Sequence, residues 1–181
     1  MSDFIYFIAG KGGSGKDTVL DIVSADLGIE VLPVHITRIP RPDDRHVIRA
    51  TVEELRSMPE ADVEIREYVH VEGPVYYATF RSDAKPGVSY LLSGPSEMFR
   101  NVCWLFHDRT VIPIVLDVSA EIRMERMKGR EVAEAERRIK ADDAEWVDID
   151  NAVIIDANRS LQEVVKDVKE IIHETLDNTV T

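Results

Sequence analysis

Cysteine is almost absent from this sequence: Cys103 is the single one among 181 residues. A disulfide framework and a cysteine-rich zinc site are therefore excluded. Hydrophobic runs are short, and none approaches the roughly 20 residues that a membrane-spanning helix needs. The first ten residues also lack the basic flank and the cleavage pattern of a secretory signal. We therefore expect a protein of the reducing cytoplasm, without membrane association.

Basic residues are few relative to acidic ones. Lys and Arg number 22 and Asp and Glu number 34, so the formal net charge is −12. Such a chain is poorly suited to bind nucleic acid or an anionic membrane surface. The 44% of hydrophobic residues is typical of a globular protein, and the length suits one domain.

Short apolar runs alternate with helical patterns along most of the chain. The runs that predict buried strands are residues 4–9, 31–36, 88–92, 111–116 and 152–155. The predicted helices are residues 18–27, 51–58, 95–106 and 120–127, with a last helix that begins near residue 160. This alternation predicts a three-layer α/β/α fold, in which helices cover both faces of a parallel central sheet.

A polar stretch, residues 37–80, interrupts this order. Within it, residues 63–71 and 75–79 predict two short strands. We interpret the stretch as a small strand-rich insert at the carboxyl edge of the sheet, where such folds bind ligands.

Two segments have the form of a capping box, Thr51–Glu54 and Ser160–Glu163. The second opens a helix whose apolar side chains are expected on one face. These side chains are Leu161, Val164, Val165, Val168, Ile171 and Ile172.

The segment Gly10–Lys16 fits the phosphate-binding pattern GxxxxGK, between a predicted strand and a predicted helix. Glycines let backbone N–H groups converge on phosphate oxygens, and the helix N-terminus adds partial positive charge. The Lys16 ammonium can reach the β- and γ-phosphates of ATP. The expected nucleotide-binding residues are Gly10, Gly12, Gly13, Ser14, Gly15, Lys16, Asp17 and Thr18.

Asp17 stands where this pattern usually has Ser or Thr. Its carboxylate can bind Mg²⁺ directly or through a water, since Mg²⁺ prefers oxygen ligands. It can also act as a general base toward an incoming hydroxyl. A further alternative is an acidic first-turn residue that the helix dipole favours.

Lys11 adds a second lysine to the loop. In this respect the loop resembles that of partitioning ATPases of the MinD and ParA type, in which the first lysine crosses a dimer interface. That resemblance covers the loop alone, and an exposed loop lysine is the alternative.

Downstream of the loop the sequence resembles the guanylate kinase superfamily of P-loop nucleoside monophosphate kinases. Residues 37–42, TRIPRP, are similar to the family's TTRxPRxGE segment. The resemblance implies that Arg38 and Arg41 bind the acceptor phosphate, which suits two forked guanidinium groups.

Residues 67–79 are similar to the family's segment E-W…G-x-YYGT. The resemblance implies that Glu67 accepts from the guanine N–H edge, that Tyr77 contacts the acceptor phosphate and that Thr79 lies at the guanine edge. The alignment needs a one-residue shift, so Glu64 is an alternative to Glu67. An outward position on an exposed strand is the other interpretation of Glu67.

Residues 123–139 are similar to the family's lid, which implies that Arg130 and Arg138 close over the transferring phosphate. A solvated helix with Glu/Arg pairs is the alternative for Arg126 and Arg137. Residues 153–158 are similar to the segment near the donor adenine, so Asn158 or Asp156 is expected to contact the base.

Two departures from the family bear on the acceptor. The family's tyrosine in DYxF has no counterpart, and Leu91–Gly94 replaces the segment LDID, whose last Asp helps to read guanine. Both changes recur in the related ribose 1,5-bisphosphate phosphokinases. We expect Gly94 to leave free space beside the acceptor base.

The resemblance thus implies an ATP- and Mg²⁺-dependent kinase, monomeric or homodimeric, with a small-molecule phosphate acceptor. The expected acceptor is a (deoxy)nucleoside monophosphate, GMP or dGMP first. The alternatives are a ribose 1,5-bisphosphate phosphokinase and a non-catalytic guanylate-kinase-like binding module. The expected single domain has a core of residues 1–36, 82–128 and 146–181, an acceptor-binding insert of residues 37–81 and a lid of residues 129–145.

Overall fold

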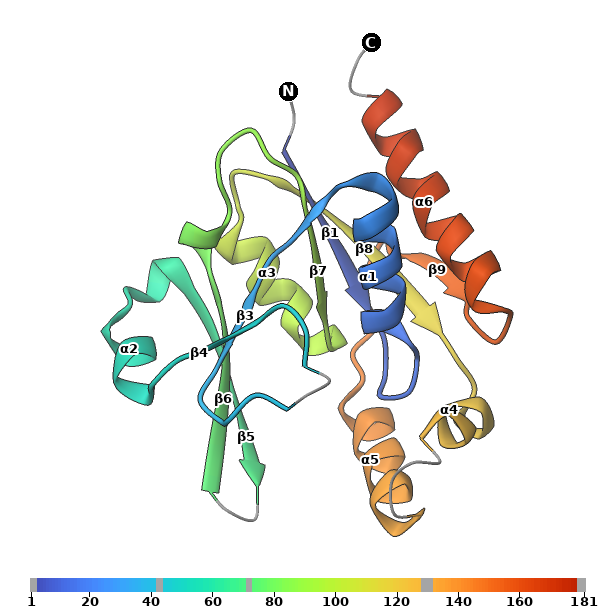
Figure 1. The fold of residues 1–181 in the computed structure, drawn as a ribbon, viewed down its shortest axis with the longest axis horizontal. Helices are drawn as coiled ribbons and strands as arrows, with labels where there is room; N and C mark the ends of the chain where they lie inside the picture. The colour runs from blue at the N-terminus through green and yellow to red at the C-terminus, as the bar shows by residue number, and fades with distance from the viewer. Residues whose placement is uncertain (1–2, 42–43, 71–72, 128–131, 179–181) are drawn as a thin grey trace.

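The structure, a computed structural model, describes residues 3–41, 44–70, 73–127 and 132–178. Five parallel strands form the central sheet in the order β2-β7-β1-β8-β9. Their bounds are β1 Phe4–Ala9, β2 Glu30–Val31, β7 Tyr90–Gly94, β8 Thr110–Asp117 and β9 Val153–Asp156. The helices α1 (Lys16–Leu27) and α6 (Leu161–Asp177) cover one face, and α3 (Phe99–Leu105) covers the other (Figure 1). The predicted three-layer α/β/α class is confirmed.

Strand β1 is buried along its whole length because helices lie on both faces of the sheet. Its side chains alternate between the two faces. Phe4, Tyr6 and Ile8 pack in the core on the side of α1 and α6. Ile5, Phe7 and Ala9 pack in the second core, on the side of α3.

The two predicted capping boxes are present in the structure. One opens α2 (Val52–Ser57) at Thr51, and the other opens α6 at Ser160. The predicted apolar face of α6 is buried at Val164, Val165, Val168 and Ile172. Leu161 differs from the prediction: it lies in the first turn and is 42% exposed.

The predicted strand at residues 31–36 is divided between two sheets. Pro33 separates β2 from β3 (Val34–Ile36), and a proline has no N–H to donate to a continuing ladder. Strand β3 joins a small four-stranded sheet of order β4-β3-β6-β5. The other members are β4 Val47–Arg49, β5 Val63–His70 and β6 Gly73–Phe80. The small sheet therefore begins with β3, at residue 34, whereas the insert was expected to begin at residue 37.

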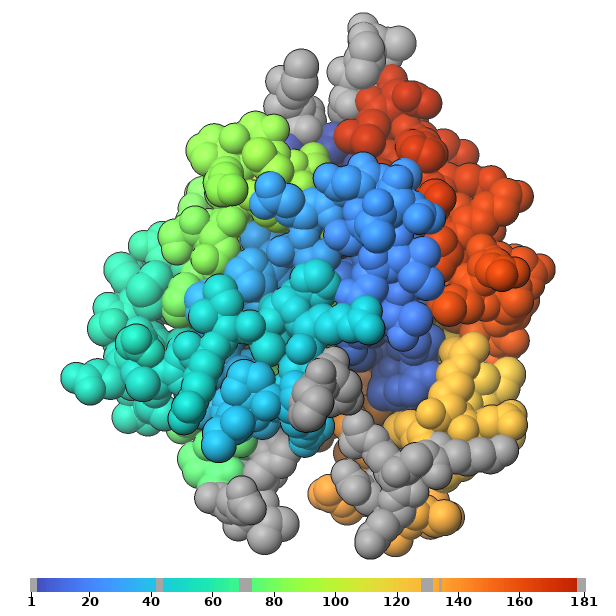
Figure 2. Space-filling view, viewed as in Figure 1, coloured from blue at the N-terminus to red at the C-terminus, as the bar shows by residue number. Residues whose placement is uncertain are grey.

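The remaining elements are two helices and three 3₁₀ turns outside the two sheets. Helices α4 (Ala120–Arg126) and α5 (Val132–Glu145) follow β8, and the 3₁₀ turns η1, η2 and η3 are Glu60–Asp62, Arg81–Asp83 and Ser96–Met98. In the space-filling view the cyan segment that contains β4 and the yellow and orange helices α4 and α5 lie on either side of the lower end of the blue α1 (Figure 2). Among the described residues, no helix combines the length and the hydropathy needed to span a membrane.

Candidate active site

The phosphate-binding loop has the backbone that its glycines were predicted to provide. Gly13 and Gly15 have φ angles of 82° and 85°, the left-handed region that residues with a Cβ disfavour. A Cβ at Gly10 would lie 2.4 Å from the Ser14 hydroxyl oxygen. The Ser14 N–H donates to the Lys11 carbonyl at 3.0 Å, which closes the loop into a tight turn. The loop is thus a ready cradle for an anion at the N-terminus of α1.

A cavity of about 430 Å³ opens over this loop. Its lining residues are Gly12, Gly13, Gly15, Lys16, Asp17, Thr18, Arg126, Met127 and Arg138. The structure thus brings Lys16 and Arg138, both predicted to bind phosphate, to one cavity. Three cationic side chains at one cavity suit a polyphosphate. Arg130 lies outside the described residues.

Arg126 also lines this cavity, although the sequence analysis gave a solvated helix as the alternative for this residue. Its guanidinium donates to the Ser14 carbonyl at 3.1 Å and to the Ala157 carbonyl at 2.9 Å. It therefore connects the phosphate loop to the segment after β9. In the sequence, the one feature that pointed to Arg126 was its spacing of three residues from Arg123 in one short predicted helix.

Asn158, predicted to contact the adenine, is exposed and engaged within its own loop. Its Oδ1 accepts from the Ser119 N–H at 2.9 Å, and its Nδ2 donates to Asp156 Oδ1 at 2.8 Å. The hydrogen bonds from the Asn158 backbone N–H and side chain lower the pKa of Asp156. Asn158 does not line the cavity over the phosphate loop.

Asp17 and Thr18 lie in the first turn of α1, and both are exposed. The Ser93 hydroxyl donates to Asp17 Oδ1 at 2.9 Å, which orients the carboxylate at the end of β7. No cluster of three or more His, Cys, Asp or Glu side chains suited to a metal occurs in the described residues. Mg²⁺ in nucleotide sites is held by one or two carboxylates, phosphates and waters, so the oxygen donors at Asp17 and Thr18 fit that ion.

Arg38 and Tyr77 meet at the small sheet, as predicted. The Arg38 guanidinium donates to both oxygens of Asp44, at 2.5 and 3.0 Å, and its Nε donates to the Tyr77 hydroxyl at 3.2 Å. This pairing raises the pKa of Arg38 and lowers the pKa of Asp44. Arg41 is exposed and reaches Asp44 through its backbone N–H, at 2.7 Å. The forked donors of Arg38 thus hold an oxyanion in the geometry that also suits a phosphate.

The strand register separates Glu67 from the other predicted acceptor-site residues. Glu64 pairs with Thr79 across the β5–β6 hairpin, whereas Glu67 pairs with Tyr76. Because strand side chains alternate, Glu64 shares the face of Tyr77 and Thr79, and Glu67 points to the opposite face. Glu64 is 4% exposed and Glu67 is exposed. The structure therefore brings Glu64, the alternative residue, to this site in place of Glu67.

Glu64 and Thr79 place two buried oxygens side by side with spare hydrogen-bonding capacity. Arg66 Nε donates to Glu64 Oε2 at 3.2 Å. Glu64 Oε1 and Thr79 Oγ1 are buried without a well-aligned hydrogen-bond partner among the described residues. Burial raises the pKa of Glu64, and the charge of Arg66 and the nearby Asn101 side chain limit that rise. Buried polar atoms of this kind are normally satisfied, so the pair is suited to a ligand with polar hydrogens.

Gly94 does not leave the free space that the sequence analysis expected. A Cβ at Gly94 would lie 2.5 Å from Met98 Sδ and 3.1 Å from the Phe7 ring. The volume beside this glycine is filled by core side chains, so that expectation is wrong.

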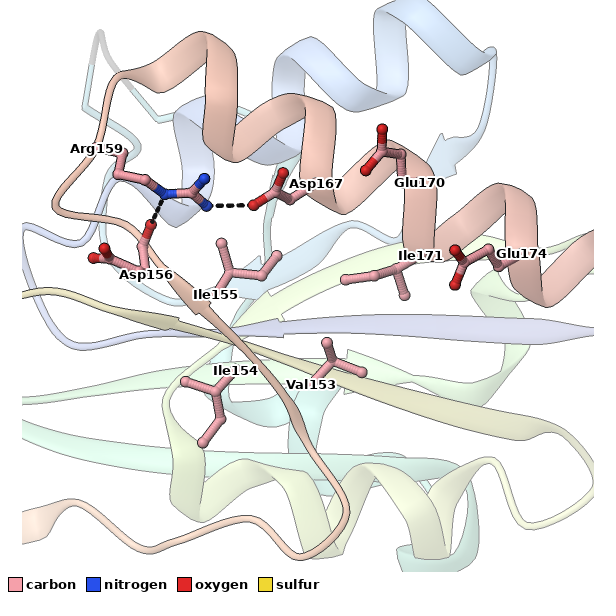
Figure 3. Close-up of a pocket in the computed structure, with 9 residues that line it drawn as sticks. All are labelled: Val153, Ile154, Ile155, Asp156, Arg159, Asp167, Glu170, Ile171 and Glu174. Carbon is pink, nitrogen blue, oxygen red and sulfur yellow. Dashed lines mark hydrogen bonds and ion pairs between the residues drawn. The ribbon is translucent and has the colours of Figure 1, made fainter.

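A second cavity, of about 270 Å³, lies between β9 and α6 (Figure 3). Arg159 bridges the Asp156 carbonyl and the Asp167 carboxylate at one end of it. Its other charged lining residues, Glu170 and Glu174, are acidic. This surplus of carboxylates disfavours a phosphate and leaves the cavity over the phosphate loop as the candidate nucleotide site.

Comparison with protein-family models and with curated proteins gives no match. Solved structures do match. A guanylate kinase from Anaplasma phagocytophilum is similar over 97% of this chain and 87% of its own, with a TM-score of 0.57 and 17% identity. A gluconokinase from Sinorhizobium meliloti is similar over 99% of this chain and 95% of its own, with a TM-score of 0.58 and 13% identity. The chain therefore shares the fold of these two kinases.

Proposed function

We propose that this chain, which has a P-loop kinase fold, transfers the γ-phosphate of ATP to a (deoxy)nucleoside monophosphate, GMP or dGMP first. One observation carries the choice of acceptor. A single face of the β5–β6 hairpin presents Tyr77, bonded to Arg38, and then, two residues along, Thr79 opposite Glu64. Two residues of a strand span about 7 Å, so one small ligand can reach both ends of this face.

On the donor side, the loop N–H groups and Lys16 hold the phosphates of ATP, and Arg138 adds positive charge from the lid helix. Mg²⁺, with Asp17 as its protein ligand, would supply neutralisation of phosphate charge. The protein itself positions the reactants and stabilises charge, which is most of what phosphoryl transfer requires.

On the acceptor side, Arg38 and Tyr77 bind the monophosphate, and Arg41 lies in the adjoining loop. Glu64 accepts hydrogen bonds from the N–H edge of the base, and the Thr79 hydroxyl lies beside that edge. A site with a buried carboxylate that keeps one oxygen for the ligand discriminates strongly against analogues that lack the matching donors.

A ribose 1,5-bisphosphate acceptor fits this face less well. Its second phosphate would have to bind near Glu64, where one carboxylate is already buried and Arg66 is its ion-pair partner. Like charges at close range oppose such binding. A non-catalytic binding module has no need for the cationic cavity over the loop.

The test is an ADP-release assay with ATP, Mg²⁺ and a panel of acceptors: GMP, dGMP, AMP, dTMP and ribose 1,5-bisphosphate. Glu64→Gln removes the charge at the proposed base-reading position, and Glu67→Gln is the matched control on the opposite face of the same strand. We expect GMP turnover in the wild type, a loss of about 10- to 100-fold in kcat/KM for Glu64→Gln, and little change for Glu67→Gln.

Two outcomes would contradict the assignment. Turnover of ribose 1,5-bisphosphate without any nucleotide would favour the sugar-phosphate kinase. Absence of ADP release with every acceptor, together with absence of ATP binding, would favour a non-catalytic module.

A further inference from the structure

The C-terminal turn of α5 lies against the phosphate loop through two adjacent carboxylates. Asp142 Oδ2 accepts a hydrogen bond from the Gly12 N–H at 2.7 Å. Asp143 Oδ1 accepts from Lys11 Nζ and from Arg123 Nη2, both at 2.7 Å. The loop that is shaped for phosphate thus holds anionic groups of its own chain.

Arg123, which donates to Asp143, is a buried residue that also packs against the phosphate loop. It is 2% exposed, and its backbone lies against Gly13, where a Cβ would come within 3.0 Å of the Arg123 carbonyl oxygen. Within the described part of the chain, its Nε and Nη1 make no hydrogen bond. Hydrogen bonding to Lys11 and the charge of Arg123 lower the pKa of Asp143, so this carboxylate is held in its charged form.

The position of these acids is unfavourable for the helix that carries them. Asp142, Asp143 and Glu145 lie in the last turn of α5, and this turn has no basic residue. Carboxylates at a helix C-terminus face the negative end of the helix dipole. The loop N–H and the two cations therefore compensate for a placement that the helix alone disfavours.

Lys11 is accounted for by the same contact. Its ammonium pairs with Asp143 of the same chain and lies 5.4 Å from the centre of the Trp146 ring. No second copy of the chain is needed to give this lysine a partner, in contrast to the arrangement in the partitioning ATPases.

We infer that Asp142 and Asp143 are positioning residues that occupy the phosphate loop when it is empty and that the terminal phosphates of ATP displace. The inference rests on the proposed nucleotide site. Asp142 already takes the single N–H of Gly12, so a phosphate that binds this N–H displaces the carboxylate and releases its contact with the end of α5. Binding of ATP is thereby coupled to the position of the helix that carries Arg138.

Inorganic tripolyphosphate is the probe, because it carries the phosphates without a base. Calorimetry compares the wild type, Asp142→Asn and the control Asp150→Asn, which removes an equal charge at an exposed turn away from the loop. We expect Asp142→Asn to bind tripolyphosphate about threefold to tenfold more tightly than the wild type, because an internal competitor lowers apparent affinity. The control should bind like the wild type.

The fluorescence of Trp146 is a second readout of the same event. A Trp104→Phe background leaves Trp146 as the single tryptophan. We expect saturating tripolyphosphate to change Trp146 emission, as Lys11 and α5 separate, and the Asp142→Asn variant to show part of this change without ligand.

Unchanged or weaker affinity in Asp142→Asn, or constant Trp146 emission at saturation, would overturn the inference and leave the nucleotide site standing. Failure of tripolyphosphate and ATP to bind even the wild type would overturn the proposed function and this inference with it.

Discussion

Ser93 and Asp17, separated by 75 residues of sequence, are joined by a hydrogen bond of 2.9 Å between the serine hydroxyl and the aspartate carboxylate. The bond connects the end of β7 to the first turn of α1, beside the phosphate loop. The bond orients one oxygen of Asp17, and because the side chain is exposed, a cation or a water can reach the other.

Asp17→Ser tests the role of that second oxygen. If Asp17 binds Mg²⁺, the Mg²⁺ concentration for half-maximal rate should rise about tenfold, equivalent to about 1.4 kcal/mol, with the maximal rate largely kept. Ser93→Ala is the matched variant, since it keeps the carboxylate and removes its hydrogen bond.

A titration of rate against Mg²⁺ distinguishes this raised Mg²⁺ requirement from two other outcomes. Collapse of the rate at saturating Mg²⁺ would indicate a general base instead of a metal ligand. A profile identical to the wild type would leave Asp17 as a residue that the helix dipole favours.

Lys16→Ala should remove most kinase activity from a folded protein. Lys16 lines the cavity over the loop, where the proposed function places the transferring phosphate. We expect a fall in kcat of about 10²- to 10³-fold, by analogy with the loss of a donor to a developing oxyanion. Lys166→Ala, at an exposed position on α6, is the control and should retain activity. Near-normal turnover of a folded Lys16→Ala protein would contradict the phosphate-loop assignment.

Arg38 and Asp44 should give opposite effects on acceptor binding. If Arg38 binds the acceptor phosphate as proposed, Arg38→Ala removes charge-assisted hydrogen bonds to it and should raise KM for the acceptor about 10- to 100-fold. Asp44→Asn removes the internal carboxylate from the same guanidinium and should lower that KM. Steady-state kinetics with varied GMP measures both, and Arg38→Lys separates the loss of charge from the loss of the fork. An increase in KM for Asp44→Asn would show that Asp44 positions Arg38 instead of competing with the phosphate.

The raised pKa of Glu64 predicts a particular dependence of stability on pH. Burial favours the protonated form in the folded state, so protonated Glu64 stabilises the fold at pH values below the unfolded pKa of about 4.3. That stabilisation is lost as pH rises through the raised folded pKa. Glu64→Gln should therefore be more stable than the wild type at pH 7, and the difference should shrink as the pH falls toward 4.

Thermal unfolding followed by circular dichroism between pH 4 and 8 measures this difference. Glu67→Gln is again the control, because it is an exposed residue of the same strand and should show no such trend. A Glu64→Gln protein that is less stable than the wild type at pH 7 would contradict the prediction that burial of the charged Glu64 carboxylate destabilises the fold.

Features that depend on nearby residues followed from the sequence. The phosphate loop needs glycines at fixed positions between one strand and one helix, and its backbone angles at Gly13 and Gly15 agree with that requirement. The capping boxes at Thr51 and Ser160 use contacts within three residues, so their pattern is readable directly. The alternation of apolar runs and helices was enough to predict the three-layer class.

What depended on distant contacts was decided by the tertiary structure alone. Pairing across the β5–β6 hairpin selected Glu64 over Glu67, because a shift in register moves a side chain to the other face of a sheet. Packing from Met98 and Phe7 filled the space at Gly94, and Asp143 on a remote helix supplied the partner of Lys11. Local spacing carries no information about such neighbours, because they come together only when separate elements pack against one another.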